Sequence, residues 1–366
     1  MSEDGRIRIG VVGCGMVAQA MHLPYLSELR DRFELVAIAD PSRAVREALA
    51  GRYAVPGVHA DHRDLLDAGG LDAVLIASPH ATHAPVVLAA LDAGLHVFVE
   101  KPLCISLADA DRIIDAGNRT GKVVQVGFMK RHDPAFERML AELPADAGSL
   151  RYVRVVCHDP EWVPFFAPAD IVKGTDVPAA VIEATRRAES EQVEQATGDG
   201  SPAAAFAFSE AYLGSMGHDV NLVHGLLERL GEPLPGRVAD AACWADGRAI
   251  TGSVALSNGA RWDSAWIQLL DTREYVETVS LYFADSVRQL VFPSPWLKQT
   301  PTRYERSEAD GLDLATRVFK SHREAFRQEL VHFHDCVRNG ALCKTPPEQV
   351  RVDMELMTAM FCATSR

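Results

Sequence analysis

The sequence predicts an α/β fold in two parts: a doubly wound parallel sheet, then an α+β part with a mostly antiparallel open sheet. A glycine-rich turn separates an apolar strand from a helical segment within residues 7–28. Apolar strands and helical segments then alternate up to residue 127, the pattern of parallel βαβ units. Beyond residue 134 the alternation gives way to strand-like runs with a period of two, typical of an antiparallel sheet with one covered face.

Chain length indicates two domains. A chain of 366 residues with 48% hydrophobic residues exceeds one ordinary domain and can build two cores. We predict domains at 1–128 and 129–366. A polar, Glu- and Ala-rich helix at about 177–200 is predicted inside the second domain, as a flap or an oligomer contact. Segments 322–339 and 347–364 are predicted as helices that pack back on the core.

Composition excludes several classes of partner. The charge of 37 minus 50, or −13, comes without a basic stripe, which argues against nucleic acid and against an anionic membrane. No apolar run approaches a membrane span, and the first residues lack the features of a signal peptide. Seven cysteines are scattered without metal-like spacing, so we expect reduced thiols, no metal site and a cytoplasmic protein.

The glycine-rich turn predicts a dinucleotide site of Rossmann type. Gly13 allows the tight turn, Gly15 lets the backbone approach a pyrophosphate, and the small Ala18 permits close packing of helix on strand. Met16 and Val17 open the helix, whose N-terminal N–H groups favour phosphate. A phosphate-free turn is the competing interpretation, because glycines also cluster in ordinary turns.

The second strand predicts which nucleotide binds. The apolar run 35–39 ends in Asp40, where an acid would hold the adenosine ribose hydroxyls and favour NAD. Ser42, a predicted helix cap, and Arg43 follow where the 2′-phosphate of NADP would lie, so NADP stays open.

Further polar residues follow later strands. Because parallel strands place their carboxyl ends along one crevice, these residues should converge on the cofactor. They are Ser78, Pro79 and His83 after the strand at 71–77, and Glu100 and Lys101 after the strand at 96–99.

Three segments resemble the Gfo/Idh/MocA oxidoreductases, the relatives of glucose–fructose oxidoreductase and inositol dehydrogenase. They are Ala-Ser-Pro-His-Ala-Thr-His at 77–83, the run at 89–102 that ends in Glu-Lys-Pro, and Gly-Phe-Met-Lys-Arg at 127–131. The resemblance runs in order through residues 6–134. It implies a nicotinamide-binding Rossmann domain, an open-sheet domain, and oxidation or reduction of a carbinol carbon of a sugar or polyol. It also implies that Lys101 approaches nicotinamide and substrate, with Pro102 shaping the turn.

Lys101 also has a chemical rationale of its own. A cation beside a carbonyl stabilises alkoxide charge that develops during hydride transfer. The competing interpretation is a surface Glu–Lys pair in a loop.

The segment 213–224 carries the second catalytic candidate. Glycines at 214 and 217 are expected to break any preceding element, so that a helix begins near His218. An imidazole titrates near neutrality and can exchange the substrate hydroxyl proton, the role that the resemblance also implies for His218. Many relatives carry an aspartate four residues earlier, where this chain has Gly214. Asp219, Asn221 and Glu210 are candidates to replace it, and the first two are predicted to bind substrate with His218.

Weaker candidates complete the set. Arg131 and His158 are predicted to contact substrate, although an ion pair and a plain loop explain them as well. His332 and His334 lie two apart on a predicted helix and therefore face different ways, which favours solvated side chains over a metal site. His80 and His83 are interpreted as hydrogen-bonding or capping residues.

These observations predict a cytoplasmic oxidoreductase that uses NAD or NADP, with NAD favoured, on a sugar, inositol or related polyol. Lys101 would polarise the oxygen and His218 would act as acid and base. The alternatives are a redox-assisted glycosidase or lyase that keeps its NAD tightly bound, and a cofactor-binding sensor without turnover. A homodimer or homotetramer is expected through the open sheet.

Overall fold

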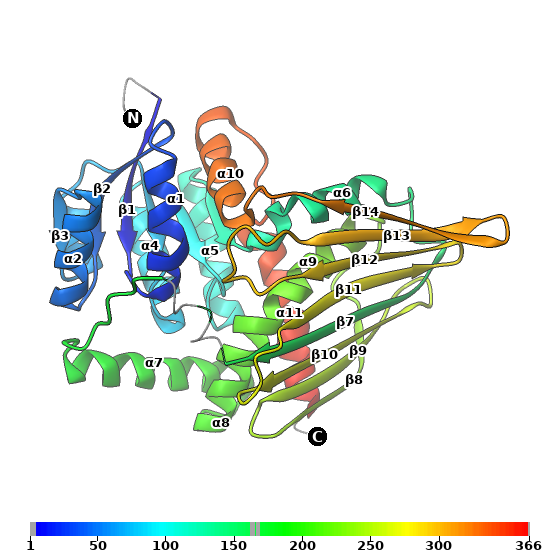
Figure 1. The fold of residues 1–366 in the computed structure, drawn as a ribbon. Helices are drawn as coiled ribbons and strands as arrows, with labels where there is room; N and C mark the ends of the chain where they lie inside the picture. The colour runs from blue at the N-terminus through cyan, green and yellow to red at the C-terminus, as the bar shows by residue number, and fades with distance from the viewer. Residues whose placement is uncertain (1–4, 162–164, 166–168, 365–366) are drawn as a thin grey trace. The chain divides into compact units, whose positions relative to one another are not determined.

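The computed structural model describes residues 5–161, 165 and 169–364 (Figure 1). The chain divides into two compact units, which we call the first and the second unit. The first unit comprises Met1–Phe128, Phe166–Gly200 and Phe326–Arg351, and the second comprises Met129–Phe165, Ser201–Ala325 and Val352–Arg366. Residues 166–200 and 326–351 thus belong to the same unit as the N-terminal part of the chain.

A six-stranded parallel sheet forms the centre of the first unit, which confirms the predicted doubly wound fold. In its strand order β3-β2-β1-β4-β5-β6, the strands β1 to β3 extend the sheet to one side and β4 to β6 extend it to the other. The topological switch point therefore lies between β1 and β4. The central strands β1, β4 and β5 are almost completely buried, because helices cover both faces. The strands are β1 Ile7–Val12, β2 Phe33–Ala39, β3 Gly57–His59, β4 Ala73–Ile76, β5 His96–Glu100 and β6 Val124–Gly127.

Side-chain caps begin several helices of this unit. Ser42 and Ser106 accept from the backbone N–H three residues on, and Gly121 ends α5 in the left-handed conformation. The predicted cap at Ser42 is therefore confirmed. The helical elements are η1 Ala18–His22, α1 Leu23–Glu28, α2 Arg43–Tyr53, α3 His62–Asp67, η2 His80–Thr82, α4 His83–Asp92, α5 Leu107–Thr120, α7 Ala179–Thr197 and α10 Ala325–Asn339.

An eight-stranded sheet dominates the second unit, in the order β14-β13-β12-β11-β7-β10-β9-β8. All neighbours pair antiparallel except β7 and β10, which are parallel, so the predicted mostly antiparallel sheet is confirmed. The strands are β7 Leu150–Pro160, β8 Arg237–Trp244, β9 Ala249–Ala255, β10 Arg261–Leu269, β11 Val276–Phe283, β12 Ser286–Phe292, β13 Arg303–Asp310 and β14 Asp313–Lys320.

Helices cover one face of this sheet. Burial alternates residue by residue along β9 to β12, as expected for strands with one covered face. Gly252 in β9 lies directly against Met360 of α11, where a Cβ atom would have no room. The helical elements are η3 Met129–His132, α6 Pro134–Glu142, α8 Pro202–Ala205, η5 Phe206–Met216, α9 Gly217–Arg229 and α11 Pro347–Thr364, which begins in the first unit.

Two local predictions were wrong. Gly214 and Gly217 do not break the chain, because η5 runs directly into α9; the flanking apolar side chains are buried, which outweighs the low helix propensity of glycine. The plain loop that was the alternative for His158 is wrong too, since β7 continues to Pro160 through pairing with β10 and β11.

Candidate functional site

The glycine-rich turn has the shape that a pyrophosphate requires. Gly13 has φ +83°, and a Cβ atom there would lie 2.5 Å from the backbone nitrogen of Ser78. Gly15 is exposed, with open space where a Cβ atom would stand. Met16 and Val17 form the first helical turn beyond it. The turn therefore leaves its backbone uncovered beside the N-terminus of a helix. This arrangement fits a dinucleotide phosphate.

Asp40 lies beside this turn at the end of β2. Its carboxylate accepts hydrogen bonds from the backbone N–H of Cys14 at 2.9 Å and of Ser42 at 2.8 Å. Burial raises the pKa of Asp40 by more than these two bonds lower it. Two N–H donors leave lone pairs on the carboxylate, which fits acceptance of two ribose hydroxyls.

The two residues that left NADP open are already engaged. The Ser42 hydroxyl donates to Asp176 and accepts from the backbone N–H of Val45. Arg43 Nε lies 2.6 Å from Oε1 of Glu47, one helical turn on. Each of these two side chains therefore already has an acidic partner within the chain.

His83 joins the two loops at the carboxyl ends of β4 and β5. Nδ1 lies 2.6 Å from the carbonyl oxygen of Pro102, and Nε2 lies 2.7 Å from that of Ser78. The side chain is fully buried. Both ring nitrogens thus contact backbone carbonyl oxygens, which confirms the hydrogen-bonding interpretation of His83, and its contact with the cofactor stays a prediction. Ser78 itself is half-buried and shares a hydrogen bond with Thr82 at 2.7 Å.

Glu100 ends β5 directly before Lys101 and is held by His22. Nε2 of His22 donates to Oε1 of Glu100 at 2.6 Å, and Oε2 accepts from the backbone N–H of Lys101 at 3.1 Å. Burial raises the pKa of Glu100, but the hydrogen bond from His22 and the neighbouring charges outweigh it and lower the pKa. Because Glu100 is buried, its hydrogen bond fixes the Lys101 backbone from the protein interior.

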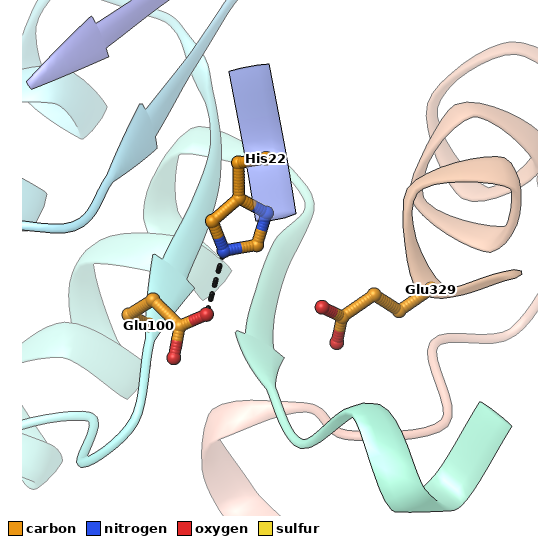
Figure 2. A group of neighbouring side chains, drawn as sticks. All are labelled: His22, Glu100 and Glu329. Atoms are coloured by element: carbon orange, nitrogen blue, oxygen red, sulfur yellow. Dashed lines mark hydrogen bonds and ion pairs between the residues drawn. The ribbon is translucent and has the colours of Figure 1, made fainter. Parts of the chain in front are cut away.

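Glu329 approaches the same pair from α10 (Figure 2). Ligand atoms of His22, Glu100 and Glu329 all lie within 4.8 Å of one another. Within the described residues, neither carboxylate oxygen of Glu329 has a hydrogen-bond partner. Burial and the charge of Glu100 raise the pKa of Glu329 well above its usual range. The two carboxyl groups are thus driven toward opposite protonation states.

Lys101 stands at the carboxyl end of the sheet, near the β1/β4 switch point. It is half-buried, and its cis peptide bond to Pro102 leads into the loop that His83 holds. An ammonium group at the carboxyl end of a parallel strand faces the crevice in which ligands of such sheets bind.

The second unit carries the other catalytic candidate. His218 lies in the first turn of α9 and is half-buried. Its neighbour Asp219 is buried, 3.7 Å from Nζ of Lys130, and Lys130 also pairs with Glu277. Burial and the charge of Glu277 raise the pKa of Asp219, whereas Lys130 lowers that of Glu277 despite burial.

A second buried network holds the middle of α9. The Asn221 amide donates to Asp353 at 2.6 Å, and Nδ1 of His224 lies 2.5 Å from the other oxygen of the same carboxylate. Asn221 is 1% exposed and its amide makes a structural contact, so this burial does not support the substrate contact predicted for it.

Two further predicted substrate residues have other surroundings. Arg131 is buried, packs against Gly225 and donates to the Asn221 carbonyl oxygen at 3.1 Å. His158 alternates with Cys157 and Asp159 along β7, which places it on the opposite face of the sheet from them. Asp159 contacts Ser215 of η5 at 3.1 Å, so His158 points away from the side that η5 covers.

His332 and His334 are not simply solvated. Nε2 of His332 lies 3.3 Å from Cys336 Sγ and accepts from the backbone N–H of Lys344 at 3.2 Å, and His334 lies 3.2 Å from Arg32.

Sequence reasoning missed the buried partners His22, Lys130, Glu277, Glu329 and Asp353. Only Lys130, inside the segment 127–131, carried any signal.

Comparisons with known proteins agree with this geometry. The model of an oxidoreductase family with an NAD-binding Rossmann fold matches residues 7–128. Inositol 2-dehydrogenase of Salmonella typhimurium is 35% identical over 135 residues, 36% of this chain and 40% of that protein. Inositol 2-dehydrogenase 3 of Saccharopolyspora erythraea is 39% identical over 145 residues, 39% of this chain and 42% of that protein. The chain thus spans about two fifths of the length of these curated relatives.

The fold is shared over a longer stretch. The WlbA dehydrogenase of Chromobacterium violaceum, solved with NADH and UDP-GlcNAcA, has a TM-score of 0.70 at 18% identity, covering 100% of this chain and 95% of that one. The likeness at this identity concerns the fold alone. The glycine turn, Asp40 and the Glu100-Lys101-Pro102 strand end all fall inside the matched 7–128. Through these residues the part of the chain at 7–128 matches the Gfo/Idh/MocA oxidoreductase family, with a Rossmann domain of the NAD-binding type.

Proposed function

We propose that the protein is an NAD-dependent dehydrogenase that transfers a hydride between nicotinamide and a carbinol or keto carbon of a sugar, inositol or related polyol. The observation that carries the proposal is the position of Lys101. It follows β5 at the carboxyl end of a nucleotide-binding sheet, and Glu100 and His83 hold the backbone on both sides of it. The names of the inositol dehydrogenase relatives support the substrate class.

The chain's residues divide the work of such a reaction. NAD, when bound, supplies the hydride acceptor. Gly13 and Gly15 receive the pyrophosphate, and Asp40 receives the ribose hydroxyls. Lys101 donates a hydrogen bond to the substrate oxygen and stabilises the negative charge that develops there. His218 takes the hydroxyl proton during oxidation and returns it during reduction.

The division of roles between the parts of the chain belongs to the same proposal. The first unit, which contains residues 1–128, binds the nucleotide, and the second unit supplies substrate contacts and the oligomer interface. Asp219 holds the first turn of α9 through its contact with Lys130 rather than touching substrate directly, because it is 2% exposed. Arg131 and His158 are left out of the proposed substrate site.

A titration tests the proposal first. The purified chain, stripped of carried-over nucleotide, is titrated with NADH and NADPH by fluorescence, and a panel of sugars and polyols is then assayed for NADH production. Tight NADH binding with turnover of a panel member supports the proposal. Absence of binding by either nucleotide overturns it, because the glycine turn would then be structural only.

We also propose a homodimer or homotetramer through the open face of the second sheet. Leu314 and Val318 on β14 are 74% and 53% exposed, and their pairing in register with β13 continues the uncovered face. An exposed apolar face of this kind is typical of a subunit interface. Light scattering coupled to size exclusion should show an oligomer, which Leu314→Glu with Val318→Glu should dissociate.

We also propose a reducing cellular compartment for the protein. The described residues contain no helix long and apolar enough to cross a membrane. All seven cysteines are free thiols, which supports a reducing compartment such as the cytoplasm.

A further inference from the structure

The segment 170–176 belongs to the first unit, although more than forty residues separate it in sequence from that unit's sheet. The backbone N–H of Val172 donates to Gln19 Oε1 at 2.8 Å, and Gln19 Nε2 donates back to the Val172 carbonyl oxygen at 3.0 Å. Arg52 at the end of α2 binds Asp170 at 2.6 Å. Two separate helical elements of the first unit, η1 and α2, therefore anchor this segment, which leads into α7 (Figure 1).

The end of this segment lies on the N-terminus of α2. The Asp176 carboxylate accepts the Ser42 hydroxyl with one oxygen and the backbone N–H of Ala44, at 3.1 Å, with the other. Gly174 allows the approach, because a Cβ atom there would lie 3.1 Å from that of Ser42. The hydrogen bond from Ser42 lowers the pKa of Asp176, so the group carries its negative charge at neutral pH.

This N-terminus is the place where NAD and NADP differ. Asp40, at the end of β2, marks the ribose, and the residues that follow it meet the 2′ position. A helix N-terminus attracts anions through its N–H groups and its dipole. Here a carboxylate of the chain already holds one of those N–H groups and the hydroxyl of Ser42. A 2′-phosphate would have to displace Asp176 or lie against its charge.

We propose that Asp176 is a specificity-determining residue that holds the anion position at the start of α2 and thereby excludes a 2′-phosphate. The inference rests on the proposed dinucleotide site and adds to it a second acid, delivered by the segment 170–176. Asp40 favours the ribose diol, and Asp176 rejects the phosphate. Arg43 does not counteract this, because Glu47 binds its guanidinium.

Charge-neutral variants test the assignment. In Asp176→Asn we expect the ratio of NADPH to NADH dissociation constants to fall by about fivefold to tenfold, as one exposed like-charge contact at about 4 Å implies. Asp170→Asn is the matched control: it changes the same charge in the same segment, but at Arg52 rather than at Ser42. Its ratio should stay within about twofold of the original, as expected for a screened surface charge. Displacement of NADH by 2′,5′-ADP, compared with ADP, isolates the phosphate from the rest of the dinucleotide.

The outcomes separate this inference from the proposed function. Selective gain of NADPH and 2′,5′-ADP affinity in Asp176→Asn, absent from the Asp170 variant, supports the assignment. Equal gains in both variants, or no change in either, overturn it and leave dinucleotide binding intact. NADPH binding to the unaltered chain as tight as NADH binding also overturns it. If neither nucleotide binds the unaltered chain, the proposed function fails, and the inference fails with it.

Discussion

Nε2 of His22 lies 2.6 Å from Oε1 of Glu100, and both side chains are buried in the first unit. The bond joins the helix after the glycine turn to the strand that precedes Lys101, so it ties the two halves of the proposed nucleotide site together. His22 also packs edge-on against Phe98 and Phe326, at centroid distances of 5.4 and 5.9 Å.

Replacing His22 should therefore weaken the fold at this junction. His22→Leu keeps the bulk but leaves a buried carboxylate without its donor, which should lower the free energy of unfolding by about 1–3 kcal/mol. Urea titration measures the change, and His59→Leu, at a half-exposed position of β3, is the control. Equal stability of the two variants would show that the bond contributes nothing.

Glu329 gives a prediction about pH. Its pKa is raised in the folded state, so the folded protein holds a proton that the unfolded chain releases above the ordinary pKa of 4.5. Stability should fall as the pH rises from there toward the folded-state pKa. Glu329→Gln removes this slope, and should be more stable than the original chain by about 1 kcal/mol or more at pH 8, with little difference at pH 4. Thermal unfolding across that range measures it.

The control for this experiment is Glu348→Gln, an exposed position in the first turn of α11. It should leave the shape of the stability profile unchanged. A Glu329→Gln profile parallel to that of the unaltered chain would contradict the assigned protonation.

Gly13 offers a test of the nucleotide turn. Gly13→Ala places a Cβ atom 2.5 Å from the Ser78 backbone at a φ of +83°, so the turn must shift, and NADH binding should be lost or weakened at least about tenfold. Gly121→Ala is matched, because it also has a positive φ but no atom within 4 Å of the added carbon. It should cost about 1 kcal/mol of stability and leave NADH binding in place.

Lys101 is tested by Lys101→Met. Loss of the cation should reduce kcat/KM by about a hundredfold to a thousandfold, because the negative charge on the substrate oxygen in the transition state would lose its hydrogen-bond donor. Fluorescence titration should still show NADH binding. Lys122→Met is the control and should retain activity. Lys122 precedes β6, so it lies at the amino ends of the strands, whereas Lys101 lies at their carboxyl ends. Comparable turnover in both variants would refute the role given to Lys101.

The ion pair of Lys130 with Glu277 yields a stability prediction. Lys130→Met leaves Glu277 buried beside Asp219 without its cation and should cost about 3–5 kcal/mol. Adding Glu277→Gln removes the uncompensated charge, so the double variant should recover part of that loss. Denaturant unfolding of both variants decides the matter; a double variant no more stable than the single one would show that the cost comes from packing.

Prediction from sequence worked where the signal is local. The glycine turn, the cap at Ser42 and the apolar runs of the parallel sheet depend on neighbouring residues, so they were predicted correctly. The strand-like runs predicted beyond residue 134 did not include β8, β13 and β14. These are edge or near-edge strands whose residues are largely polar and exposed, so they lack the period-two alternation of apolar residues that indicates a strand with one buried face. The continuous η5 and α9 were misread because burial outweighs the propensity of two glycines.

By itself, then, the sequence determined the fold class of both parts. Within its first 134 residues it also determined the glycine turn with Asp40, the strand end at Lys101 and the family resemblance. Only the tertiary structure decided which side chains support them. It brought Glu329 to Glu100, Asp176 to Ser42, and Glu277 to Lys130, over separations of more than 130 residues. Such contacts follow from how elements pack and pair, and no periodicity or spacing along the chain encodes them.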